Sequence, residues 1–137
     1  MELLSKKHFE LIVVGDDKFS TKKNRGVKYL GHINNMAELY VSVDFTVLPS
    51  KYEPFGLIVP ESLQCGTPVI VSNKVGACEL INDNEGIIIK EITPAGIAKA
   101  IETAQKQKFD IRPNFAETNG LTIQQHIEKI IETSNGS

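Results

Sequence analysis

The sequence has few of the features that mark membrane, metal-binding or nucleic-acid-binding proteins. Among its 137 residues there is no tryptophan, and there are only two cysteines. Cys65 and Cys78 lack metal-type spacing, so we expect both to be reduced and largely buried. Apolar runs such as LIVV and GIII are far shorter than the roughly 20 residues of a membrane span. The 15 basic and 17 acidic residues are interspersed, which leaves no basic stripe for nucleic acid.

What remains is the composition of a small globular domain. Hydrophobic residues make up 41% of the chain, enough for a real core, and we expect residues 1–137 to form a single domain. There is no signal-peptide pattern, so we expect a cytoplasmic location. The cluster STKKNRG (20–26) is most simply an exposed loop, and its three basic residues only weakly favour contact with an anionic membrane surface, at the inner face of the cytoplasmic membrane.

Short β-branched runs recur along the chain and predict strands. They are nearly continuously apolar, which is typical of strands buried on both faces of a parallel sheet. The predicted strands are residues 11–14, 27–30, 45–48, 69–71 and 87–89. Helical patterns alternate with them, so we predict an α/β fold with an open, doubly wound parallel sheet of the Rossmann-like kind. In such sheets ligands bind at the carboxyl ends of the strands.

The segments between these strands carry helix signals. Asn34 or Asn35 is a candidate N-cap for a helix within 34–44, and Thr93 followed by Pro94 predicts the start of a helix over 93–107. Further helices are predicted within 56–66, as a short turn within 77–83, and over 122–132. The opening MELLSKKHF resembles the end of a helix, so we expect a fragment of a longer protein; the alternative is a naturally short chain that opens with a short helix.

The stretch YEPFGLIVPESLQCGTPVIVS places two glutamates, Glu53 and Glu61, around seven mostly apolar residues. Pro60 tolerates only the first turn of a helix, so the helix should begin near residues 56–59, with Glu61 in or just after its first turn. The N–H groups of Gly56, Leu57 and Ile58 would then be free for an anion such as phosphate, and Gly56 would let a ligand come close.

Ionised carboxylates accept hydrogen bonds only, so the two glutamates suit a ligand that offers several hydroxyl groups. Phosphate together with sugar hydroxyls indicates a nucleotide sugar. The alternative interpretation is that Glu61 only complements the helix dipole and that Glu53 is a solvated loop charge.

The run LPSKYEPFGLIVPESLQCGTPVIVSNKVGACELI resembles the donor-binding signature of retaining glycosyltransferases with the GT-B fold, especially glycosyltransferase family four (group 1). FELIVVGD, VKYLGHINNMAELYVSVDFTVLPS and NEGIIIKEITPAGIAKAI extend the resemblance over about three quarters of the chain. The tail is similar to bacterial lipopolysaccharide-core glucosyltransferases. The resemblance implies the C-terminal, donor-binding half of a GT-B fold.

The resemblance also implies a role for individual residues. Glu53 would accept hydroxyls of the donor sugar as the catalytic-site carboxylate, and Glu61 would bind the ribose hydroxyls. The main chain of residues 55–57 would hold the sugar and the diphosphate, and Gly15 would line the nucleotide cleft. The turn that contains His32, Ile33 and Asn35 would contact the base.

The same family transfers a hexose with retention to a glycan or lipid-linked acceptor, and it needs no metal or other cofactor. The arginine and lysine pair that usually neutralises the diphosphate has no counterpart here, and neither has the acceptor domain, so we expect the chain alone to be inactive. Asn35 stands where some members carry an acidic residue that reads guanine, which favours a UDP-sugar over a GDP-sugar. Two rival functions stay open: a non-catalytic nucleotide-sugar-binding module and a GT-B-fold sugar-nucleotide epimerase.

Overall fold

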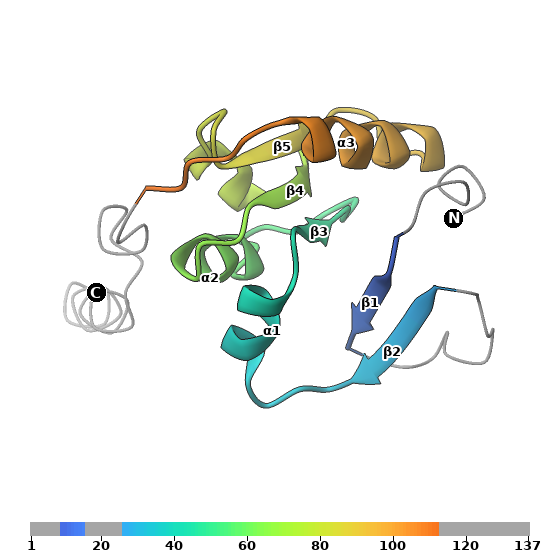
Figure 1. The fold of residues 1–137 in the computed structure, drawn as a ribbon. Coiled ribbons are helices and arrows are strands. Elements are labelled where there is room, and N and C mark those ends of the chain that lie inside the picture. Colours follow the sequence, from blue (N-terminus) through green and yellow to red (C-terminus); the bar gives the residue numbers. More distant parts are fainter. Residues whose placement is uncertain (1–8, 16–25, 113–137) are drawn as a thin grey trace, which may run out of the picture.

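The computed structural model describes residues 9–15 and 26–112 of the chain (Figure 1). In sequence order the elements there are β1 (Leu11–Val14), β2 (Val27–Gly31), α1 (Met36–Ser42), β3 (Thr46–Leu48), α2 (Ile58–Gln64), β4 (Val69–Ser72), the 3-10 helix η2 (Gly76–Leu80), β5 (Gly86–Ile89) and α3 (Pro94–Lys106). Each predicted strand is confirmed to within one residue at either end. The helix predicted over 122–132 and most of the basic cluster lie outside the described residues.

All strand pairs are parallel, as predicted, but they form two sheets instead of one. β1 pairs with β2, with Leu11 opposite Val27, and a separate sheet has the order β3-β4-β5. Figure 1 shows β1 and β2 lying apart from β3. Apolar runs predict where strands occur, but they carry no information on which strands pair with each other. The prediction of one continuous sheet was therefore wrong for the described residues.

The three-stranded sheet is covered on both faces, which confirms the doubly wound arrangement. On one face, Val69 and Val71 of β4 pack with Val59 and Leu63 of α2 and with residues of η2. On the other, Ile70 of β4 joins Ile89 and the alanines Ala100 and Ala104 of α3. The alternation of β4 side chains between the two cores follows from the two-residue period of a strand. The small alanines let α3 lie close to the sheet.

Burial of the strands differs from the prediction. Only β4, of the strands described, is buried at all four positions. Leu30 in β2 is 46% exposed and Ile88 in β5 is 39% exposed. β4 is the strand with a hydrogen-bonded neighbour on either side and a helical layer on either face, whereas the other described strands each have one neighbour. A continuous apolar run therefore does not guarantee burial on both faces.

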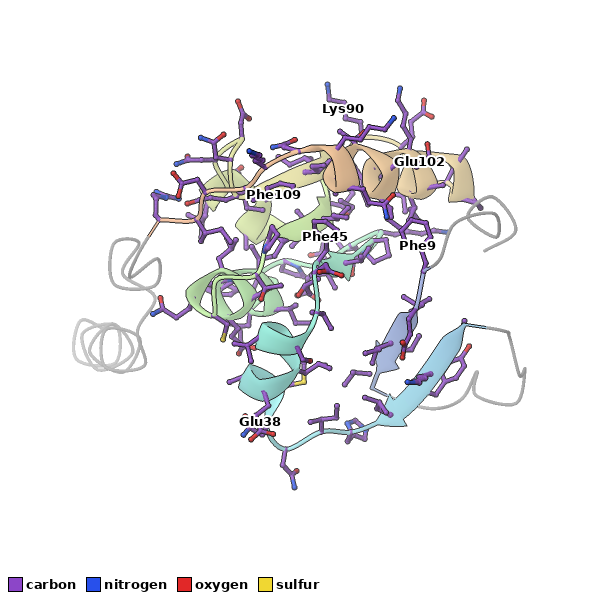
Figure 2. All side chains as sticks on the ribbon, in the orientation of Figure 1. Phe9, Glu38, Phe45, Lys90, Glu102 and Phe109 are labelled. Carbon is purple, nitrogen blue, oxygen red and sulfur yellow. The ribbon has the colours of Figure 1, made fainter. Side chains whose placement is uncertain are left out.

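Both predicted helix starts with caps are confirmed. The side chain of Asn35 accepts a hydrogen bond from the N–H of Glu38, and that of Thr93 accepts one from the N–H of Gly96. After α3 the chain returns across the sheet, where the rings of Phe45 and Phe109 meet edge to face with centroids 5.8 Å apart (Figure 2). This contact fixes the returning segment above the start of β3.

Two further expectations concern cysteine and the membrane. Cys65 and Cys78 are free thiols and half-buried instead of largely buried. Burial, with a smaller contribution from Glu79, raises the pKa of the Cys78 thiol. Within residues 9–15 and 26–112, none of the helices has the length and apolar character that crossing a bilayer would require.

Candidate functional site

The loop after β3 is fastened to the turn after β4. Glu53 and Val75 form an isolated parallel bridge, in which the N–H of Glu53 donates to the carbonyl of Lys74 and the N–H of Gly76 donates to the carbonyl of Glu53 at 2.8 Å. The hydroxyl of Ser72 also donates to the carbonyl of Ser50. Because β3 and β4 are parallel, both segments leave the sheet at its carboxyl edge. Glu53 is therefore held at the edge where ligands of such sheets bind.

The carboxylate of Glu53 turns back onto its own loop. Its Oε1 accepts from the N–H of Phe55 at 3.4 Å and from the N–H of Gly56 at 3.3 Å. These distances exceed the usual 2.7 to 3.2 Å of such hydrogen bonds, so both are weak. The carboxylate and the loop amides lie together, but the N–H of Gly56, which the sequence predicted to be free, is bound to Glu53.

Gly56 has a different reason to be glycine from the one the sequence indicated. Its φ of +75° belongs to the left-handed region, and a Cβ there would lie only 2.4 Å from Cγ1 of Val75. The residue is buried, so packing against Val75 already requires the absence of a side chain. A close approach of ligand to Gly56 stays a prediction.

The helix that follows begins within the predicted range. α2 starts at Ile58 with Leu57 as its N-cap, and Pro60 lies in the first turn as expected. Among the described residues, no group accepts a hydrogen bond from the N–H of Leu57 or Ile58. Within the apolar stretch between the glutamates, Val59 anchors the helix on the sheet. Phe55 and Leu57 do not, because they are 53% and 56% exposed beside the loop.

Glu61 lies in the first turn of α2, as predicted, and is exposed. It has a partner that the sequence analysis missed. The hydroxyl of Tyr40, in α1, donates to Oε2 of Glu61 at 3.0 Å. Tyr40 is buried. A buried tyrosine needs a partner for its hydroxyl, which was the available signal for this contact.

The other predicted site residues lie at the ends of β1 and β2 and before α1. The N–H of Gly15 donates to the carbonyl of Gly31 at 2.9 Å, so these two strand ends are joined. Ile33 is half-buried in the connection to α1, and Asn35 uses its side-chain oxygen to cap that helix. No contact in the described structure brings Gly15, Ile33 or Asn35 to the glutamates.

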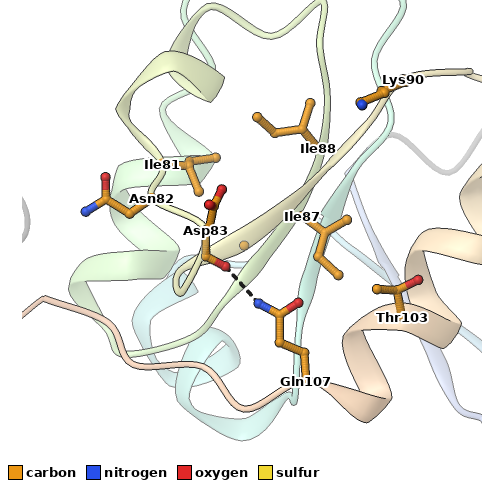
Figure 3. Close-up of a pocket in the computed structure, with 9 residues that line it drawn as sticks. Ile81, Asn82, Asp83, Ile87, Ile88, Lys90, Thr103 and Gln107 are labelled. Carbon is orange, nitrogen blue, oxygen red and sulfur yellow. Dashed lines mark hydrogen bonds between the residues drawn. The ribbon is translucent and has the colours of Figure 1, made fainter.

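A shallow hollow of about 390 Å³ lies elsewhere, along β5 and α3 (Figure 3). Across it, the side-chain amide of Gln107 donates to the carbonyl of Asp83 at 2.7 Å. Its lining combines isoleucines with polar side chains and contains none of the predicted site residues. In the part of the chain that the structure describes, no three side chains of His, Cys, Asp and Glu gather closely enough to hold a metal ion.

A parallel α/β sheet of this kind binds ligands at the carboxyl edge of its strands, where the loop after β3 places Glu53, and comparison with known proteins gives the family. The family model for glycosyl transferases group 1 matches residues 1–120, so the chain belongs to that family. A probable transglycosylase of Burkholderia thailandensis is 36% identical over 81 residues, which are 59% of this chain and 22% of that protein. The chain thus spans only about a fifth of this relative's length.

Solved structures agree with the fold. Sucrose-phosphate synthase from Thermosynechococcus elongatus is similar with a TM-score of 0.63 and 26% identity, over 72% of this chain and 29% of that one. HepE from Anabaena, in complex with UDP-glucose, has a TM-score of 0.60 and 23% identity, over 96% of this chain and 43% of that one. The likeness confirms the α/β fold with parallel sheets that the GT-B resemblance predicted.

Proposed function

We propose that this chain is the nucleotide-sugar-binding domain of a retaining hexosyltransferase of glycosyltransferase family four, with UDP-glucose as its donor. The observation that carries the proposal is the bridge between Glu53 and Val75, which holds a carboxylate and the amides of Phe55 and Gly56 together at the carboxyl edge of the sheet. Family membership and the UDP-glucose bound to the HepE structure support the choice of donor.

In this proposal each part of the donor has its own binding residues. The second oxygen of Glu53 accepts sugar hydroxyls, while the amides of residues 55–57 face the diphosphate. The long hydrogen bonds from Phe55 and Gly56 to Oε1 of Glu53 are weak, so donor oxygens replace them at little cost. Glu61 accepts the ribose hydroxyls, and Gly15, Ile33 and Asn35 contact the nucleoside.

In the transfer reaction, the amides of residues 55–57 stabilise the leaving group. As the bond between the anomeric carbon and the diphosphate breaks, negative charge develops on the leaving diphosphate, and preorganised amide dipoles stabilise it. Cations from the remainder of a longer protein complete that stabilisation, and its second domain supplies the glycan or lipid-linked acceptor of a cell-surface polymer such as lipopolysaccharide. The reaction retains the anomeric configuration and uses no metal.

Calorimetric titration of the chain with UDP and UDP-glucose tests the role of Glu53. UDP-glucose should bind more tightly than UDP. Glu53→Gln should lower the ratio of the two affinities about tenfold, since a hydrogen bond to a charged group is worth roughly 1.5 kcal/mol or more. Glu91→Gln, which changes an exposed glutamate beyond β5, is the matched control. Unchanged discrimination in Glu53→Gln would contradict the proposal.

The rival functions differ in products. Full-length protein given UDP-glucose and acceptor should release UDP and glucosylate the acceptor. An epimerase would convert the nucleotide sugar without any acceptor, and a binding module would leave it intact. Product analysis by anomeric proton resonance decides among the three and also shows whether configuration is retained.

A further inference from the structure

Tyr40 joins two helices at the predicted ribose site. It lies in α1, only 3% exposed, and its hydroxyl donates to Oε2 of Glu61 in the first turn of α2. Glu61 itself is exposed. A buried phenol thus donates to a carboxylate at the surface.

The tyrosine is fixed at its main chain as well. The hydroxyl of Thr67, in the turn after α2, donates to the carbonyl of Tyr40. The carbonyl of Thr67 in turn accepts from the hydroxyl of Ser62 at 2.9 Å, and Ser62 follows Glu61 directly in the helix. Tyr40, Glu61, Ser62 and Thr67 therefore form a closed ring of contacts. Such a ring leaves the phenol little freedom to move relative to the helix that carries Glu61.

This geometry restricts one side chain that would otherwise be mobile. An exposed glutamate samples many rotamers, and holding it in one costs conformational entropy. The hydrogen bond from Tyr40 selects the rotamer before any ligand arrives. Among the described residues nothing donates to the other oxygen, Oε1, so it stays available as an acceptor. Burial, and secondly the contact with Glu61, raise the pKa of Tyr40, so the phenol remains a donor.

We propose that Tyr40 is a positioning residue for Glu61, whose carboxylate it fixes so that Oε1 faces the ribose hydroxyls of the donor nucleotide. The inference rests on the proposed function of Glu61 in binding ribose. It adds a residue from a different helix, and it predicts an effect on recognition of the ribose hydroxyls and not on the rest of the ligand.

The experiment is calorimetric titration of the chain with UDP and 2′-deoxy-UDP. The wild-type chain should prefer UDP. Tyr40→Phe should lower that preference by about three- to tenfold and leave the affinity for 2′-deoxy-UDP unchanged, as expected for the loss of a single orienting hydrogen bond. Tyr29→Phe makes the same chemical change in β2 and should keep the full preference. The double variant Tyr40→Phe/Glu61→Gln should behave as Glu61→Gln alone.

The outcomes separate the inference from the function on which it rests. Equal weakening of both nucleotides in Tyr40→Phe would show a merely structural role and overturn the inference. It would also be overturned if Glu61→Gln lost the preference while Tyr40→Phe kept it. If the wild-type chain bound both nucleotides equally, the proposed role of Glu61 would fail and positioning by Tyr40 with it. Urea unfolding of each variant confirms that the compared chains are folded.

Discussion

Gly56 and Val75 are packed so closely that any side chain on Gly56 would clash with Val75. A Cβ on Gly56 would lie 2.4 Å from Cγ1 of Val75, well inside van der Waals contact, and the φ of Gly56 is +75°. On the same side, a Cβ on Gly76 would lie 2.1 Å from the carbonyl oxygen of Pro54. Gly56 and Gly76 thus allow the loop after β3 (residues 49–57, the glutamate loop) to touch the turn after β4, and this contact sets the position of Glu53.

The first prediction concerns that contact. Gly56→Ala should destabilise the chain by about 3 kcal/mol, because it adds overpacking to the strain of a left-handed alanine. Gly66→Ala is the matched control, since Gly66 has a φ of +81° but nothing within 4 Å of its Cβ position. It should cost only about 1 kcal/mol. Urea unfolding measures both, and equal costs would refute the packing explanation. In a Val75→Ala background the cost of Gly56→Ala should fall.

The second prediction concerns the ion pair that ties residues 108–112 to the end of the sheet. Arg112 donates to Glu85 from Nε at 2.5 Å and from one terminal nitrogen at 2.9 Å, and it also donates to the carbonyl of Leu80. Glu85 is fully buried, whereas the Arg112 side chain is 33% exposed. Arg112→Ala should therefore cost roughly 2 to 3 kcal/mol at pH 7, below the range for fully buried pairs. Lys108→Ala, in the same segment, should cost little.

The stability lost in Arg112→Ala should depend on pH, and the pKa of Glu85 gives the direction. Burial alone raises the pKa of Glu85, but hydrogen bonds from Arg112 and from the N–H of Asn82 outweigh it and leave the pKa lowered. A carboxyl with a depressed pKa stabilises the fold fully above its unfolded pKa of about 4.3, and that stabilisation is lost as pH falls through the folded pKa. The gap between wild type and Arg112→Ala should shrink from pH 6 to pH 3. A gap independent of pH would show that Arg112 acts through packing.

The third prediction separates two roles of Asn35. Its side-chain oxygen caps α1, a role that aspartate fills equally well, so Asn35→Asp should leave stability unchanged. If Asn35 also faces the base, the same variant should raise affinity for GDP relative to UDP, since a carboxylate accepts from the donor groups of guanine. Asn34→Asp adds the same charge one position earlier, without the cap, and is the control. An unchanged ratio of UDP to GDP affinity would confine Asn35 to capping.

The sequence predicted the elements well because their signals are local. The β-branched runs marked five strands, and Asn35, Thr93 and Pro60 marked helix starts that the structure confirms. Pairing between strands is not local, so the division into two sheets was missed. The predicted burial of the strands on both faces was wrong for the same reason. Leu30 and Ile88 belong to apolar runs, but they are exposed and lie in strands with one described neighbour.

In the candidate site, too, local features were predicted and contacts between distant residues were missed. The glutamate loop was predicted from spacing and from the glycosyltransferase resemblance, and the structure does bring Glu53 together with the amides of Phe55 and Gly56. The contact between Tyr40 and Glu61 spans 21 positions in sequence, and no local pattern specifies it. The clash that makes Gly56 a glycine depends on Val75 in a different loop, so sequence alone indicated the residue without its cause.

The central claim is that the two glutamates bind opposite ends of one nucleotide sugar. Calorimetric titration of the chain with UDP-glucose, UDP and glucose, repeated for Glu53→Gln and Glu61→Gln, tests it most directly. Glu61→Gln should weaken UDP and UDP-glucose alike, by about tenfold, whereas Glu53→Gln should weaken UDP-glucose and spare UDP. Glu91→Gln should match wild type. If both glutamate variants bind all three ligands as the wild-type chain does, the donor site is not here.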